Sequence, residues 1–351
     1  MTLPWADAPI RPARAQLPSL TWRWDAPVTA LAFSRRSGYL AAASGDGTMR
    51  IGSPKDPTDL NVVEAHKGAV LALRHDLAAD AFVSGGDDGR LVQTRTDGSC
   101  QTLLHEPRHW IDTIAVADTV RAVALGREVR LLDASGKQIG RTDNHPSSVS
   151  GLAFNPKGRR LAVSHYDGVT LWWAASLGGT PLRYKWRGSH IGISWSPDGK
   201  YLMTATQERE LHGWRLADGS DLRMSGYAVK IRSFDWIAKP PFFVTNGADS
   251  VTAWSFSGRG PEGRPPFEFG HRPGILVSCV AAHPKRPLAA FGYDDGEVRI
   301  AELPGSRVSQ VRRGDGGKVT AVAWSPDGGI LAAGTEDGTV SAIDLPPDGL
   351  W

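Results

Sequence analysis

Residues 319–345 read VTAVAWSPDGGILAAGTEDGTVSAIDL, and this stretch carries the pattern that the rest of the chain repeats. Two apolar runs of strand length, Val319–Trp324 and Ile330–Ala333, are separated by a Pro-Asp-Gly turn. A Glu-Asp-Gly turn then leads into a third run, Thr339–Leu345. Asp-Gly between such runs favours a tight hairpin, because glycine adopts a positive φ without steric cost. The stretch therefore predicts three successive antiparallel strands.

The same unit recurs along almost the whole chain. The position that Trp324 occupies can be followed eight times, with spacings of 38 to 46 residues, at Phe33, His75, Val116, Phe154, Trp195, Trp236, Ala282 and Trp324. Five of the eleven Asp-Gly pairs fall at the second turn of the unit. A period of about 42 residues built from short strands is typical of a propeller blade. The sequence thus predicts an all-β, closed β-propeller of four-stranded antiparallel blades, an architecture that favours binding over catalysis.

The number of blades follows from counting the units and their outer strands. Each of the first seven units is followed by a candidate fourth strand, whereas the eighth runs out of chain. One β-rich segment, Leu20–Trp24, is left over at the front, and we expect it to supply the outer strand of the last blade and so close the ring. This predicts eight blades, the alternative being seven with an irregular blade. We expect residues 1–18 to be extended or mobile and residues 19–351 to form a single propeller domain.

Composition limits the classes of protein to consider. The chain has 351 residues, 41% of them hydrophobic and 22% charged, which is ordinary for a soluble globular protein. Its net charge of +3, from 40 basic and 37 acidic residues, argues against a dedicated nucleic-acid binder. Cys100 and Cys279 form no metal or redox motif, and no apolar run is long enough for a signal peptide or a transmembrane helix. We expect a cytoplasmic protein, monomeric on its own, with no membrane partner; its residue preferences suggest a bacterial source.

The repeating unit resembles the WD40 repeat family over roughly residues 20–345. The resemblance rests on the Trp-Ser-Pro-Asp-Gly turns at 195–199 and 324–328, on Ala-Ser-Gly-Asp-Gly-Thr at 43–48 and on tryptophans at the end of the third strand. In that family a His before the first strand, a Ser or Thr in the second, the turn Asp and the Trp form a hydrogen-bonded network. Residues at matching positions are His66, Ser84, Asp88, His145, Asp167, Trp172, His271 and Asp295. The resemblance implies a structural role for them rather than a catalytic one.

Signatures of chemistry are absent from the sequence. No Gly-x-Ser-x-Gly elbow, phosphate-binding Gly-rich loop or His-Glu-x-x-His motif is suited to catalysis. The Asp-Gly turns lack the spaced carboxylates of a calcium loop. We therefore expect no catalytic residues, no metal and no cofactor, and we interpret the chain as a non-enzyme.

Residues that break the repeat on one loop face are the candidates for partner binding. The segments before the first strand and between the second and third strands open on the same face, and large or charged residues there have no packing role. These residues are Arg108, His109, Trp110, Tyr166, Tyr227, Lys230, Arg272 and Lys318. Aromatic and arginine side chains on a rigid rim are typical of interface hot spots. The sequence therefore favours a protein–protein interaction scaffold or adaptor.

Two other functions stay open. A small-ligand binder or lactonase-type enzyme would use the central channel, where Asp87, Asp294 and Glu336 lie on separate units. A binder of nucleic acid or another anionic partner would use arginines and lysines such as Arg35 and Arg36. Steeply salt-dependent binding would favour the second alternative.

Overall fold

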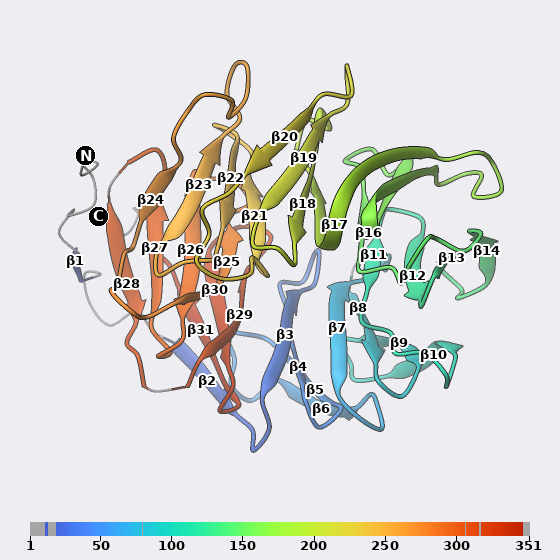
Figure 1. Cartoon of the computed structure of the whole chain (residues 1–351). Coiled ribbons are helices and arrows are strands. Elements are labelled where there is room, and N and C mark those ends of the chain that lie inside the picture. Colours follow the sequence, from blue (N-terminus) through green and yellow to red (C-terminus); the bar gives the residue numbers. More distant parts are fainter. Residues whose placement is uncertain (1–10, 13–18, 79, 306, 316, 347–351) are drawn as a thin grey trace.

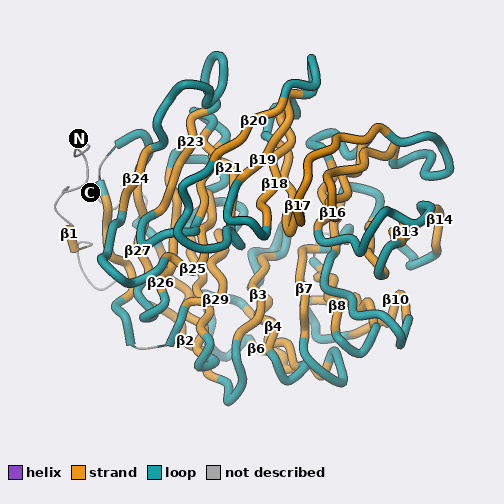
Figure 2. Tube along the Cα trace, viewed as in Figure 1, coloured by secondary structure: helices purple, strands orange, loops and turns teal. Residues whose placement is uncertain are grey.

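The regular secondary structure of the described residues consists of β-strands alone. The computed structural model describes residues 11–12, 19–78, 80–305, 307–315 and 317–346. Within these ranges there are 31 strands and no helix, as Figure 2 shows. The strands form seven hydrogen-bonded sheets, which stand around a centre with their first strands innermost (Figure 1). The prediction of an all-β propeller with four-stranded antiparallel blades agrees with this architecture.

The last sheet joins a strand from the N-terminal region to the last three strands of the described chain. It contains β29 (Val319–Trp324), β30 (Ile330–Thr335) and β31 (Thr339–Asp344), and its outer strand is β2 (Ser19–Arg23) from the N-terminal region. β2 pairs antiparallel with β31, from Ser19 opposite Ile343 to Arg23 opposite Thr339. Trp22 and Trp24 are buried in the same cluster as Val340. The predicted contribution of an N-terminal strand to the last blade is present.

Five further sheets follow the predicted order of strands along the chain. The first contains β3 (Val28–Phe33), β4 (Leu40–Ser44), β5 (Thr48–Gly52) and β6 (Leu60–Glu64), and the second β7 (Val70–His75), β8 (Ala81–Gly86), β9 (Arg90–Arg95) and β10 (Cys100–His105). The third contains β11 (Ile114–Val116), β12 (Arg121–Leu125), β13 (Glu128–Leu132) and β14 (Gln138–Arg141). Two others contain β21 (Phe234–Ile237), β22 (Phe242–Thr245), β23 (Val251–Ser255) and β24 (Phe267–Phe269), and then β25 (Val277–Ala282), β26 (Leu288–Tyr293), β27 (Val298–Glu302) and β28 (Val308–Arg312). A short strand, β1 (Arg11–Pro12), adds to β28 in parallel; the rest of the predicted mobile segment 1–18 lies outside the described residues.

The fourth and fifth units share one six-stranded sheet, and here the prediction of eight blades is not supported. The sheet contains β15 (Gly151–Phe154), β16 (Arg160–Trp173), β17 (Leu182–Trp195), β18 (Tyr201–Thr206), β19 (Leu211–Arg215) and β20 (Asp221–Met224). β16 and β17 are each 14 residues long, because β16 continues through the Asp167-Gly168 turn inside its unit and β17 continues through the boundary between the two units. Tyr166 pairs with Ser189, so hydrogen bonding runs from one unit into the next. The number of sheets is therefore seven, one of them irregular.

Side-chain packing rather than strand pairing holds neighbouring sheets together. Within the described ranges no strand ladder joins one of the seven sheets to the next, but inner strands contact one another around the centre, including β29 with β3. The repeated tryptophans contribute directly. Trp324 Nε1 donates to the Ala281 carbonyl at 3.1 Å, which joins two neighbouring sheets, and Trp195 Nε1 donates to the Ala153 carbonyl at 3.0 Å, which joins the fourth and fifth units inside their shared sheet. Each of these bonds connects one inner strand to the preceding one. An indole in the repeat thus gives both apolar packing and a specific hydrogen bond.

Candidate interaction surface

One face of the ring carries the second turns and the segments that precede the inner strands. Within a unit, backbone hydrogen bonds connect the second turn to the segment that precedes the inner strand, as the second and eighth units show. The Asp87 amide donates to the Ala69 carbonyl at 3.2 Å, and the Glu336 amide donates to the Lys318 carbonyl at 2.8 Å. Loops that are bonded in this way form a fixed platform, on which an exposed side chain is already ordered before a partner arrives. We call this face the turn face.

The predicted network of the second unit is complete except at its Trp position. His66 Nδ1 lies 3.0 Å from Asp88 Oδ1, and His66 Nε2 lies 2.9 Å from Ser84 Oγ. Because an ionised carboxylate only accepts, Nδ1 carries the proton and the Ser84 hydroxyl donates to Nε2. Burial tends to raise the pKa of Asp88, but hydrogen bonds from the Lys67 amide and from His66 outweigh burial and lower this pKa. The arrangement ties the segment before β7 to the second turn.

Replacing Asp88 with alanine is expected to destabilise the protein by about 2 kcal/mol, because His66 Nδ1 and the Lys67 amide lose their acceptor. Urea unfolding measures the effect. The matched control is Asp97→Ala in the same unit, where the carboxylate bonds only to exposed Ser99. Equal losses of stability in the two variants would contradict a special role for the network.

The network of the fourth unit lacks its predicted carboxylate. Trp172 Nε1 donates to His145 Nε2 at 3.0 Å, and His145 Nδ1 lies 2.8 Å from the Arg127 carbonyl oxygen. Asp167 makes no hydrogen bond to His145; it has a φ of 67° at the bend of β16. Burial lowers the pKa of His145 to about 4, so the ring is neutral at pH 7. The predicted set of His145, Asp167 and Trp172 is thus correct in position but not in its contacts.

In the seventh unit an arginine takes the place expected for the histidine. Arg272 holds Asp295 through two bonds of 2.9 and 2.7 Å and also lies 3.2 Å from Glu297. His271 points elsewhere, with Nε2 3.3 Å from Asp249. The predicted pairing of His271 with Asp295 therefore does not occur. Arg272 is also a poor candidate for partner contact, because two carboxylates occupy its guanidinium group.

Tyr227 is a structural residue of the sixth unit rather than an exposed candidate. It is only 8% exposed; its hydroxyl lies 2.9 Å from Thr245 Oγ1 and accepts a 2.8 Å bond from Trp254 Nε1. Burial raises the pKa of Tyr227 to about 12. A tyrosine thus occupies the place that His has in the family network, between the Thr of the second strand and the Trp of the third. Little of the Tyr227 side chain is therefore accessible to a partner, and the observed contacts support a structural role for it.

Trp110 is the most exposed large apolar side chain on the turn face. It is 69% exposed, and the adjacent Arg108 and His109 are exposed too. Its loop is nevertheless anchored, because Ile111 is fully buried and the Ile111 amide donates to the Gly86 carbonyl at 3.0 Å. The His109 amide donates to the Glu106 carbonyl at 2.9 Å on the other side. A large aromatic ring is therefore presented to solvent from a rigid support.

Tyr166 lies at the edge of a surface cavity that the repeat pattern did not predict. This cavity of about 640 Å³ is lined by Tyr166, by Trp186 and by three cations, Arg183, Lys185 and Arg187. The three cations alternate along β17 with Tyr184 and Trp186, and none of them forms an ion pair among the described residues. The signal was present in the sequence as the run Arg-Tyr-Lys-Trp-Arg at 183–187.

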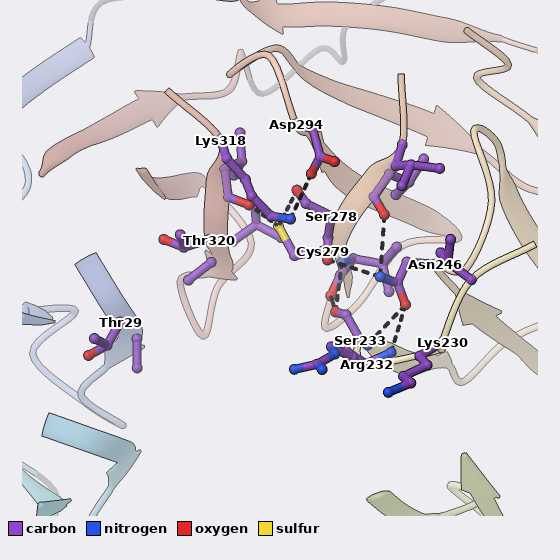
Figure 3. Close-up of a pocket in the computed structure, with 18 of the residues that line it drawn as sticks. Thr29, Lys230, Arg232, Ser233, Asn246, Ser278, Cys279, Asp294, Lys318 and Thr320 are labelled. Atoms are coloured by element: carbon purple, nitrogen blue, oxygen red, sulfur yellow. Dashed lines mark hydrogen bonds and ion pairs between the residues drawn. The ribbon is translucent and has the colours of Figure 1, made fainter. Parts of the chain in front are cut away.

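Lys230 and Lys318 line the central channel, which holds a cavity of about 850 Å³ (Figure 3). Lys318 Nζ lies 2.9 Å from Asp294 Oδ1. The wall also includes Arg74, Arg209 and Arg232, none of which was singled out from the sequence. The structure thus brings Lys230 and Lys318 to one cavity, while Arg108 to Trp110 and Tyr166 lie on other units.

Neither a metal cluster nor a membrane span is found in the part of the chain that the structure describes. No group of three or more His, Cys, Asp or Glu side chains there is arranged to hold a metal ion. Within the same ranges, no helix has the length and hydropathy that crossing a membrane requires.

Comparison with known proteins identifies the repeats. A model of the WD domain, G-beta repeat, matches residues 18–51 and 136–173, and a model of the anaphase-promoting complex subunit 4 WD40 domain matches residues 280–347. The chain carries WD40 repeats. The matched ranges include both the N-terminal strand that completes the last sheet and the last unit itself, which agrees with the resemblance seen in the sequence.

Relatives of the WD40-repeat chain are eukaryotic proteins that are longer than the part it matches. It is 30% identical over 318 residues to the ribosome biogenesis protein WDR12 homolog of Chlamydomonas reinhardtii, covering 88% of this chain and 61% of that protein. It is 25% identical to the WD repeat-containing protein WDS homolog of Arabidopsis thaliana, covering 88% of this chain and 53% of that protein. These relatives give no support to the bacterial source expected from composition.

A solved structure supports the fold alone. The computationally designed Ika8 protein superposes with a TM-score of 0.75, covering 92% of the WD40-repeat chain and 98% of the designed chain, at 19% identity.

Proposed function

We propose that this WD40-repeat protein is a non-catalytic scaffold, present in the cytoplasm, that binds a partner protein on its turn face. The observation that carries the proposal is Trp110, which is 69% exposed on an anchored loop beside Arg108 and His109. Tryptophan and arginine dominate the binding energy of protein interfaces, since a rigid aromatic ring buries a large area with little loss of conformational entropy. The match to a WD40 domain from a subunit of a multiprotein complex supports the same reading.

The buried histidines also favour a scaffold over an enzyme. His66 and His145 form hydrogen bonds inside the sheets, where each supports a turn or a strand. Neither ring faces the 850 Å³ channel cavity, whose lining contains no histidine. General acid–base catalysis requires such a group within hydrogen-bonding reach of a substrate. We therefore infer that His66 and His145 have a structural role.

Trp110→Ala is expected to weaken capture of the partner by roughly 30-fold, which corresponds to about 2 kcal/mol for an interface hot spot. The test compares affinity capture by the tagged wild-type and variant proteins from native lysate at about 150 mM salt. The matched control is Trp173→Ala, because Trp173 is 53% exposed but lies at the far end of β16, under the Arg160 guanidinium at 4.7 Å. A partner that is retained equally by both variants would place the interface elsewhere.

A second candidate function is recognition of an anionic partner at the hollow beside Tyr166. Arg183, Lys185 and Arg187 offer three exposed cations on one strand, and Tyr166 is 47% exposed beside them. Side chains two residues apart on a strand project from the same face about 6.6 Å apart, so these cations can meet successive anionic groups. Association through this hollow would weaken steeply with salt, whereas association through Trp110 would change little.

A further inference from the structure

The central channel has a charge that the rest of the molecule does not share. Its cavity is lined by five basic residues, Arg74, Arg209, Lys230, Arg232 and Lys318, and by one acidic residue, Asp294. The lining therefore has a formal charge of +4, while the whole chain has only +3. Everything outside the channel lining consequently sums to −1. The cations come from loops and strands that are far apart in the sequence, so the fold itself gathers them.

Most of this positive charge lacks a carboxylate partner. Lys318 pairs with Asp294, which accounts for one cation. Among the residues that the structure describes, Arg74 and Arg209 bond only to backbone carbonyls, of Leu73 and Ala228, at 2.8 and 3.1 Å. The side chains of Lys230 and Arg232 form no hydrogen bond or ion pair with any described residue. Desolvation lowers the pKa of Arg74, as expected for a cation whose charge is poorly compensated.

The backbone that carries Arg232 is held rigidly even though its side chain is free. Asn246 is 5% exposed, and its Oδ1 accepts hydrogen bonds from the Arg232 and Ser233 amides at 3.0 and 3.1 Å. Its Nδ2 donates to the Val277 and Ser278 carbonyls at 3.3 and 3.0 Å, which joins the sixth and seventh units. Figure 3 shows Lys230 and Arg232 extending from this support into the open centre of the channel. Cations that extend from a rigid backbone around an open volume can converge on an anion without rearrangement of the fold.

We propose that the channel binds a small molecule that carries several phosphate groups. The cavity of about 850 Å³ lies within the usual range of roughly 300–1,000 Å³ for small-ligand sites. Arginine binds phosphate through paired N–H donors and lysine through a point charge, and both are present here. A linear triphosphate carries about as much negative charge as the lining carries positive charge. This site is separate from Trp110, so the channel proposal does not depend on the proposed scaffold function.

The probe is inorganic tripolyphosphate, titrated into the purified full chain by isothermal calorimetry at about 150 mM salt. We expect one molecule bound per chain. The double variant Lys230→Ala/Arg232→Ala is expected to bind at least 10-fold more weakly, because two charge-assisted contacts are lost. The matched control is Lys157→Ala, which removes an exposed cation from the opposite face and is expected to bind like the wild type.

A second variant keeps the test informative if the double variant folds poorly. Asp294→Asn removes the one carboxylate of the lining and releases Lys318, so tripolyphosphate is expected to bind severalfold more tightly. A damaged fold would not tighten binding. No binding by the wild type would overturn the proposal, as would unchanged affinity in the double variant or weaker binding by Asp294→Asn. A loss in Lys157→Ala as large as that in the double variant would also overturn it, because binding would then follow surface charge in general.

Discussion

Replacement of Arg121 by alanine is expected to lower the free energy of unfolding by about 3–5 kcal/mol. Arg121 and Asp76 are both fully buried, and the guanidinium donates to the two carboxylate oxygens at 2.5 and 2.7 Å. Gln93 and the Asp133 carbonyl complete the hydrogen bonding of the pair. Removing Arg121 leaves Asp76 charged in an apolar interior with too few partners, and this penalty is the main source of the loss.

A double replacement separates the penalty of an unpaired charge from the net contribution of the pair. Asp76→Leu combined with Arg121→Met removes both charges and keeps the volume nearly constant. We expect this variant to be less than half as destabilised as Arg121→Ala, since well-packed apolar residues often replace a buried ion pair at little cost. Urea unfolding measures the free energy of unfolding of both variants, and an unchanged m-value shows that the comparison is valid. An Arg121→Ala variant as stable as the wild type would contradict the burial of the pair between the second and third units.

Stability is expected to fall steeply as the pH decreases from about 6.5 toward 4. Burial lowers the pKa of His145 and of His212 from 6.5 to about 4 in each case. Between these values the unfolded chain binds a proton at each histidine and the folded chain does not, so protons favour unfolding. Each ring then contributes roughly 3 kcal/mol of stability above pH 6.5 that is lost by about pH 4. Burial also lowers the pKa of His165 and of His190, so these two histidines add to the loss of stability at low pH.

His212→Phe isolates one of these titrations. The imidazole is fully buried and stacked on Trp186 at 3.9 Å, and neither ring nitrogen has a hydrogen-bond partner among the described residues. Asp221, 3.8 Å away, raises the His212 pKa, but burial outweighs it. A phenyl ring keeps the stacking and removes the proton site, so the loss of stability between pH 6.5 and 4 is expected to shrink by roughly 3 kcal/mol. Identical pH profiles for the variant and the wild type would contradict this assignment.

Strands and turns were predictable because each unit contains its own signals. Val319–Trp324 was predicted as a strand and is β29, and the Asp-Gly pair at 337–338 forms the turn between β30 and β31. The sharing of one sheet by the fourth and fifth units was not predictable. It depends on Tyr166 pairing with Ser189, although the adjacent Asp167-Gly168 pair indicates a turn at which the strand would be expected to end.

Site residues were less predictable, because the same loop position holds different chemistry in different units. His66 and Asp88 could be transferred from the repeat pattern, since both residues of the pair are present at the expected spacing. At positions 271 and 272 a histidine and an arginine are adjacent, and spacing does not indicate which one reaches Asp295. Tyr227 was predicted to have no packing role, but its phenol takes the place of the imidazole in the network. The channel cations come from separate units, so only the closed fold shows that they share one cavity.

Hydrogen–deuterium exchange of the complex between the full chain and its captured partner tests the binding face most directly. A partner on the turn face is expected to slow exchange of backbone amides at residues 106–111, around Trp110, relative to the free protein. The turns at 155–158, 197–199 and 326–328 lie on the opposite face and are expected to exchange unchanged. Protection confined to those opposite-face turns, with none at residues 106–111, would contradict a scaffold that binds through Trp110.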